Sequence, residues 1–265
     1  HKPADRVPID LGASRVSGMH VSTVYKLRQH LDLDQPGTPV KVIEPVQMLG
    51  EIGSDLLDAI GADAVGLFAP KTSFGYALEN WKPWTLFDGT PVLVPEYFNT
   101  DPAPDGDVLM YPQGDKTAPP SGRMPKGGFY FDMIIRQQPI DEEKLDPMEN
   151  VEEYQAIGQE TLDYYAREIQ RLHDGSDRAV LANYGGTAFG DISTIPGVAL
   201  KNPKGIRDIE EWYITLYTRP DYVRAMFDRQ CEIGLANLQK IHEVVGEKPA
   251  IAYTSGTDFG TQNGP

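Results

Sequence analysis

Four short apolar runs along the chain have the pattern of β-strands that are buried on both faces. They cover residues 6–11, 63–68, 178–183 and 248–253, and small or polar residues such as Gly, Thr and Asn follow each run. Near-continuous apolar runs of this length are typical of parallel sheets, because helices cover both faces of such sheets. The pattern therefore predicts about four parallel strands.

Between these runs, apolar residues recur at the i, i+3, i+4 spacing of amphipathic helices. One such pattern covers residues 42–60 and ends at Gly61, which is suited to a helix C-cap. A second runs from Asn150, a candidate N-cap, to Gly175. A third covers residues 206–246 and predicts two helices, because Pro220 interrupts it and favours a new helix start.

This alternation of strands and helices predicts an α/β fold with a parallel sheet. Right-handed crossovers place the carboxyl ends of all the strands on one side of the sheet. The loops that follow the strands then converge, and in α/β proteins these loops carry the active site. The candidate functional residues are therefore those that follow the four apolar runs.

Residues 81–133 depart from this alternation. Short alternating runs flank Asp88-Gly89, a dipeptide typical of β-hairpins, and further Pro- and Gly-punctuated runs follow. We predict a β-rich excursion inserted into one domain of 1–265, because no internal repeat or low-complexity linker divides the chain. Three interpretations stay open for the excursion: a lid, an oligomer contact, or a surface decoration.

The amino-acid composition disfavours nucleic acids and membranes as binding partners. The chain has 39 acidic and 24 basic residues and a formal net charge of −15, which repels nucleic-acid backbones and anionic membranes. No apolar run reaches the roughly 18 residues of a membrane span. The single cysteine and the absence of a signal-peptide core favour the reducing cytoplasm. Because residue 6 already enters a strand-like run, we expect the natural start upstream.

Two candidates follow the first apolar run. Arg15 lies among small residues, where a guanidinium can hold a carboxylate by a planar, two-point contact; a surface ion pair is the alternative. His20 is a candidate general acid or base because its ordinary pKa lies near neutrality, and a structural histidine is the alternative.

Further candidates follow the other runs. Lys71 and Tyr184 are candidate substrate-binding residues after the second and third runs. Asp258 is a candidate catalytic carboxylate after the fourth run, and Gln262 is a candidate for binding the substrate beside it. The alternative for the Asp-Phe-Gly-Thr segment is an Asx-type turn.

Several common motifs are missing. No GxGxxG follows the first run, and the glycines of residues 183–191 lack the Lys-Ser/Thr of a phosphate-binding loop. Cys231 has no His or Cys at a metal-ligand spacing, so we assign no metal ligand and expect a buried apolar role for it.

Three segments carry a resemblance to a known family. The segments HKPADRVPIDLGA (1–13), LLDAIGADAVGLF (56–68) and SGTDFGTQNGP (255–265), in this order, resemble the uroporphyrinogen decarboxylase (URO-D) superfamily. The resemblance implies a (β/α)8 TIM barrel, of which this chain would supply the N-terminal half plus the excursion. It also implies one of two activities, decarboxylation of a porphyrinogen or methyl transfer with a corrinoid protein. Family members that activate thiols bind zinc through residues of the C-terminal half, which in this chain would lie beyond Pro265.

The chain departs from the decarboxylase pattern at two places. The decarboxylases of the family have an Arg-Gln-Ala-Gly-Arg stretch after the first strand, and its arginines bind the substrate carboxylates. In the corresponding residues 13–22 of this chain, Arg15 is the one arginine. The decarboxylases also place a catalytic Asp after the second strand, where this chain has Pro70 and Lys71. The Thr257-Asp258 pair is closer to the Asp-Asp of the methyltransferase-like branch.

The leading hypothesis is therefore a methyltransferase that works with a corrinoid protein on a small-molecule substrate, with Asp258 and Gln262 at the substrate's polar edge. Decarboxylation with Arg15 as the carboxylate anchor is the second hypothesis. The third is a non-catalytic binding or assembly protein that uses residues 81–133. We also expect an open half barrel to expose apolar sheet edges, which a missing C-terminal part or a homo-oligomer would cover.

Overall fold

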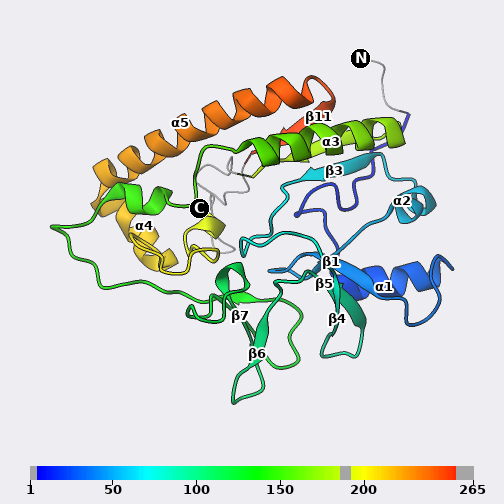
Figure 1. The fold of residues 1–265 in the computed structure, drawn as a ribbon, viewed down its shortest axis with the longest axis horizontal. Coiled ribbons are helices and arrows are strands. Elements are labelled where there is room, and N and C mark those ends of the chain that lie inside the picture. Colours follow the sequence, from blue (N-terminus) through cyan, green and yellow to red (C-terminus); the bar gives the residue numbers. More distant parts are fainter. Residues whose placement is uncertain (1–4, 186–191, 255–265) are drawn as a thin grey trace.

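The computed structural model describes residues 5–185 and 192–254, which form a mixed α/β fold with parallel and antiparallel sheets (Figure 1). Three strands form a parallel sheet in the order β11-β10-β3. They are β3 (Ala64–Phe68), β10 (Ala179–Asn183) and β11 (Pro249–Tyr253). Three of the four predicted parallel strands are confirmed.

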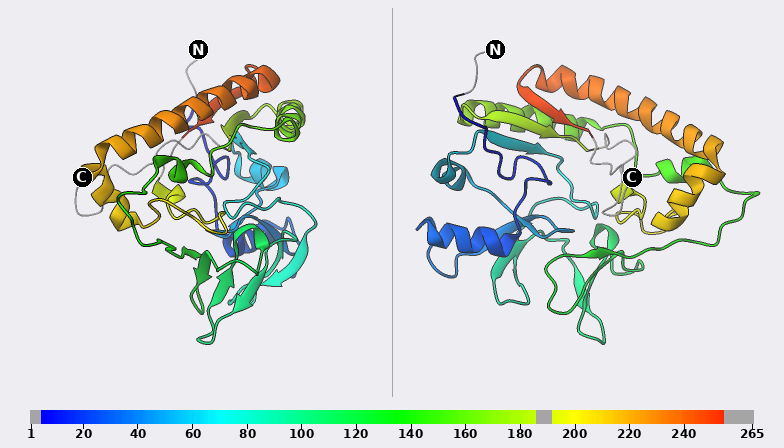
Figure 2. Two further views of the ribbon diagram at one scale, coloured as in Figure 1. Left: turned by 60° about the vertical axis from the view of Figure 1, so that its left-hand side comes forward. Right: turned by 180° about the vertical axis from the view of Figure 1, so that it is seen from behind.

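Two long helices cover one face of this sheet: α3 (Gln159–Gly175) and α5 (Pro220–Val245). Figure 2 shows both helices on the same side of the sheet from two further directions. The sheet and the helices meet in an apolar core, since side chains of β3 and β10 pack against both helices. Its fully or nearly buried members are Leu67, Leu162, Tyr165, Ile169, Leu172, Val180, Ala182, Ile241 and Val245.

The prediction of a strand over residues 6–11 is wrong. This segment has no strand hydrogen bonding, and Val7 is 83% exposed. Asp63 explains the difference, because its carboxylate accepts from the Ile9 amide at 2.7 Å and pairs with Arg6. Pro8 supplies no amide hydrogen for a ladder. This parallel sheet therefore has three strands in place of four, and the described residues form no closed barrel.

The prediction of one helix over residues 42–60 is also wrong in its first half. This segment contains β1 (Val40–Glu44), β2 (Leu49–Gly50) and only then α2 (Ser54–Ile60). β-branched residues open the segment with strict alternation of burial, and Pro45 stops the strand. Gly61 caps α2 in the left-handed conformation with φ 68°, as the sequence predicts.

Residues 81–133 form antiparallel hairpins that are joined to the first part of the chain. β4 (Lys82–Thr85) and β5 (Pro91–Val94) make the predicted hairpin, and β5 also pairs in parallel with β1. The rest of the excursion forms a separate antiparallel sheet of four strands, with a 3₁₀ turn within its connections. These elements are β6 (Thr100–Pro102), β7 (Val108–Met110), η1 (Pro112–Gly114), β8 (Gly122–Met124) and β9 (Asp132–Met133).

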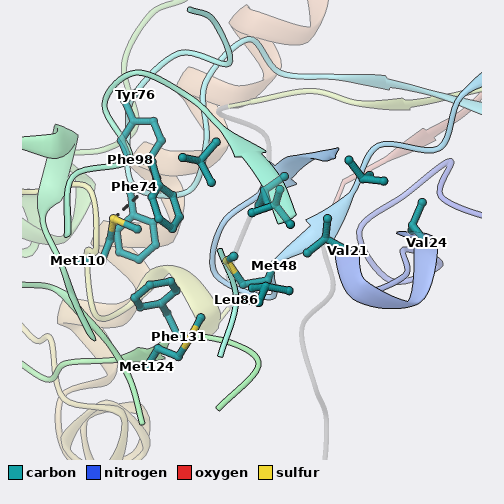
Figure 3. Packing of buried hydrophobic residues seen from close by; sticks show 14 of the residues in the cluster. Val21, Val24, Met48, Phe74, Tyr76, Leu86, Phe98, Met110, Met124 and Phe131 are labelled. Carbon is teal, nitrogen blue, oxygen red and sulfur yellow. Dashed lines mark hydrogen bonds between the residues drawn. The ribbon is translucent and has the colours of Figure 1, made fainter. Parts of the chain in front are cut away.

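The excursion shares its core with the N-terminal region (Figure 3). Val21 and Val24 of α1 (Val21–His30) belong to the same buried cluster as Phe98, Met110 and side chains of β1, β5, β7 and β8. Removing the excursion would therefore open a core that residues outside it also line. This packing differs from that of a decoration on a finished surface.

The helical pattern after Asn150 is shorter than expected. Asn150 lies in the 3₁₀ helix η2 (Pro147–Val151), and α3 begins only after Gly158. The Asn150 side chain is buried and binds the Ile206 backbone in both directions, at 2.6 and 2.7 Å, so it is not available as the α3 N-cap. A second 3₁₀ turn, η3, covers Ile192–Thr194.

The predicted break at Pro220 is confirmed. α4 (Ile209–Thr218) ends just before it, and α5 begins with Pro220 as its first residue. The carboxylate of Asp208 caps α4 by accepting from the amides of Glu210 and Glu211. No helix within the described ranges combines the length and the apolar character that crossing a membrane requires.

Candidate functional site

A cleft of about 490 Å³ lies along the free edge of β3. Residues 11–18, the β1–β2 region, α2 and the start of the segment after β3 line it, and α3 contributes at its far end. β3 pairs only with β10 within the described sheet, so its second edge faces this cleft. The cleft therefore brings four segments that are separate in sequence to one concave surface, as small-molecule sites do.

Arg15 lines the cleft and takes part in a short chain of hydrogen bonds. Its guanidinium Nη1 donates to Ser73 Oγ at 2.9 Å, and Ser73 Oγ donates to Glu44 Oε1 at 3.0 Å. Glu44 also lines the cleft, although its residue is only 4% exposed. The loop after the first apolar run and the segment after β3 therefore meet at Arg15.

Lys71 lines the same cleft, three residues beyond the end of β3. A backbone bridge with Ala77 and the bond from Thr72 N to Tyr76 O place it at the base of a tight turn over residues 71–77. Within the described ranges, neither Arg15 nor Lys71 forms an ion pair, whereas Arg28, Arg178 and Arg219 each contact a carboxylate.

His20 does not line the cleft, and its contacts are structural. Its Nδ1 accepts from the Ser22 amide at 3.2 Å and so caps α1, while Nε2 lies 2.7 Å from the Phe129 carbonyl oxygen. A carbonyl only accepts, so Nε2 carries the proton and the ring is neutral. Burial lowers the pKa of His20, which favours this neutral form. These contacts support the structural alternative for His20.

This geometry predicts a pH-dependent contribution to stability. Protonation of Nδ1 would remove the cap, so the contribution is complete above the ordinary pKa of 6.5 and is lost as the pH falls through the lower folded-state pKa of His20. The nearby charge of Asp88 opposes the shift and that of Lys26 adds to it. Asparagine can cap a helix but does not titrate in this pH range. We therefore expect the urea midpoint of the wild-type protein to fall more between pH 7.5 and pH 5 than the midpoint of His20→Asn falls over the same range. Equal falls would contradict this.

Tyr184 packs away from the cleft. Its ring lies 5.2 Å from that of Tyr165, in the core between the sheet and α3, and burial raises its pKa to about 12. The Tyr165 hydroxyl accepts from the Gly185 amide at 3.0 Å, which holds the start of the loop after β10. The cleft thus contains Arg15 and Lys71 of the predicted residues, without His20 or Tyr184. Asp258 and Gln262 lie outside the described residues.

Two residues of the site are missing from the sequence predictions. Glu44 escapes the sequence analysis because residues 42–60 have a helical pattern, which would put Glu44 on a helix far from any strand end. Ser73 escapes it because it lies five residues beyond β3, further from the strand end than Lys71. The alternation at Val40 and Val42 followed by Pro45 is the signal that identifies Glu44 as the end of a strand.

The described residues contain no group of His, Cys, Asp and Glu side chains that could hold a metal ion. Cys231 is exposed on α5, so the prediction of a buried apolar role for it is wrong. Together, the fold and the cleft define a mixed α/β protein with two cations in one concave site that have no acidic partner among residues 5–185 and 192–254. No family model matches the chain, and no curated protein or solved structure matches it either.

Proposed function

We propose that the cleft binds a small molecule through a carboxylate group, with Arg15 and Lys71 as the two cations that hold it. The observation that carries this proposal is that both cations line one cleft without an acidic partner in the described part of the chain. In a chain with a net charge of −15, carboxylates are abundant partners for basic side chains. Two cations in a cleft with no acidic partner in the described segments favour an anion from outside the protein.

The geometry of Arg15 suits a carboxylate more than a diffuse anion. Ser73 takes one N–H of the guanidinium, so the other donors of its planar fork stay available for a two-oxygen contact. Lys71 adds a compact second charge from the segment after β3. Apolar side chains of Ile43 and Phe68, neither of which is fully buried, line the same cleft and would contact the body of the molecule.

The reaction that we propose is methyl transfer between this small molecule and a corrinoid protein, in an enzyme of the superfamily that the sequence resembles. The support for the reaction is the resemblance, and the support for the substrate is the cleft. This chain's residues would bind and orient the methyl donor or acceptor, which lowers the barrier by proximity. The described residues do not fit a zinc site, so we derive no step through zinc.

Carboxylate binding can be tested directly by calorimetry with acetate, succinate and benzoate, each compared with its methyl ester. We expect binding of at least one acid and about tenfold weaker binding in Arg15→Ala and in Lys71→Ala, since an exposed charge-assisted contact contributes about 1–1.5 kcal/mol. Lys240→Ala, on the exposed surface of α5, is the matched control. If none of the acids binds better than its ester, the proposed site is wrong.

Decarboxylation is the second candidate, and the same anchor favours it, because the family's decarboxylases hold substrate carboxylates with arginines. The two reactions have different readouts. Methyl transfer changes the visible spectrum of the cobalt centre when the enzyme is mixed with methylcobalamin and the acid that binds. Decarboxylation releases carbon dioxide from that acid and leaves the cobalt spectrum unchanged.

A further inference from the structure

We propose that Ser73 and Glu44 are positioning residues that fix the guanidinium of Arg15 for carboxylate binding. This inference rests on the proposed function, because it assigns roles around the same anchor. Neither residue needs to touch the bound acid, since both act through Arg15.

The hydroxyl of Ser73 has only one hydrogen, and its two partners determine where that hydrogen points. Arg15 can only donate, so Ser73 Oγ accepts from its Nη1 at 2.9 Å. The hydroxyl then donates to Glu44 Oε1 at 3.0 Å. The direction of both bonds is therefore fixed, and the guanidinium is held at one corner while its remaining donors have no partner among the described residues.

Glu44 is the fixed end of this chain. It is the last residue of β1, and its second carboxylate oxygen accepts from the Gln47 amide at 2.7 Å. Both oxygens of a buried carboxylate are thus bonded, which the cost of burying a charge requires. A charged acceptor also strengthens the bond from Ser73 and, through it, the bond from Arg15.

Ser73 is held in place from the other side by the turn that carries it. Gly75 N donates to Thr72 O within this turn, and Gly75 has a φ of 91°, which only glycine adopts at low cost. The next residue after Ser73 is Phe74, whose side chain is fully buried beside Tyr76 and Phe131 in the core of the excursion (Figure 3). The excursion therefore supports the turn that presents Ser73 and Lys71.

The test compares single and double variants in the same acetate, succinate and benzoate titrations. We expect Ser73→Ala to weaken acid binding roughly 3–10-fold, as the loss of one hydrogen bond does, and Ser73→Thr to restore it because the hydroxyl is retained. Glu44→Gln keeps an acceptor but removes the charge, so we expect an intermediate loss. Binding of the methyl esters should not change in any of these variants.

The double variant Arg15→Ala/Ser73→Ala distinguishes positioning from a general structural role. If Ser73 acts only through Arg15, its substitution has no further effect once Arg15 is removed. Equal effects of Ser73→Ala in both backgrounds would overturn the inference, and so would wild-type affinity in both Ser73→Ala and Glu44→Gln. If Arg15→Ala itself binds like the wild type, the proposed function fails instead, which is a separate outcome.

Discussion

Substitution of Phe74 by alanine is expected to lower the free energy of unfolding by about 3–5 kcal/mol, which is a large share of the 5–15 kcal/mol typical of whole domains. Phe74 is fully buried, with its ring centroid 6.4 Å from that of Tyr76 and 6.2 Å from that of Phe131. Truncation would leave a ring-sized cavity between the turn 71–77 and the excursion. Urea unfolding followed by tryptophan fluorescence measures the loss.

A neighbouring glycine provides an internal check on this cavity. A Cβ added at Gly122 would lie only 2.7 Å from Phe74 Cζ, so Gly122→Ala alone should destabilise the protein. In the Phe74→Ala background the obstructing ring is gone, and we expect the cost of Gly122→Ala to become smaller. Phe87→Ala is the matched control, because Phe87 is 43% exposed and should change stability by no more than about 0.5 kcal/mol. Equal losses at Phe74 and Phe87 would contradict the packing described here.

The sequence predicts the parallel sheet well because its strands carry unambiguous signals. The runs of β3 and β10 are mostly apolar and pair residue by residue, Ala64 with Ala179 and Phe68 with Asn183. The run at 6–11 is half apolar, but it includes Arg6, Pro8 and Asp10 and forms no strand. There the decisive interaction is between Asp63 and the Ile9 amide, a contact across more than fifty residues that no local pattern contains.

In residues 42–60 the sequence predicts a helix where the structure has two strands before the helix. The apolar positions of this segment fit both the helical period of 3.6 and, over the first few residues, the strand period of 2. Pairing of β1 with β5, which comes from the excursion, decides for the strand. Because the partner strand lies some fifty residues away, only tertiary structure resolves the ambiguity, and with it the position of Glu44 at the site.

The candidate site was predictable to the extent that it follows strand ends. Arg15 and Lys71 meet in one cleft although the first of the expected strands is not formed, because residues 11–18 still run beside β3. His20 and Tyr184 also follow predicted strands, but each contacts a structural partner outside the cleft. His20 caps the N-terminus of α1, and Tyr184 packs against the ring of Tyr165. Position after a strand therefore selects candidates, and side-chain partners decide among them.

Substitution of Arg207 by methionine is the second change with a large expected effect, again about 3–5 kcal/mol, because it leaves a largely buried carboxylate without its cation. Arg207 is 1% exposed and pairs with Glu153 at 2.5 Å. Its other guanidinium nitrogens donate to the carbonyl oxygens of Lys204 and Glu149. The side chain thus ties η2 to the segment that leads into α4, and methionine fills its volume without any of these donors.

A double-mutant cycle separates the ion pair from the rest of this network. In Glu153→Gln the cation of Arg207 stays buried with carbonyl partners only, so this variant should also be destabilised. We expect the double variant Arg207→Met/Glu153→Gln to be more stable than the sum of the two single losses predicts, because no unpaired charge remains. Arg229→Met is the matched control, since Arg229 forms only an exposed pair with Glu232 on α5. Additive losses, or a loss in Arg207→Met no larger than in Arg229→Met, would show that the buried pair does not hold this part of the fold together.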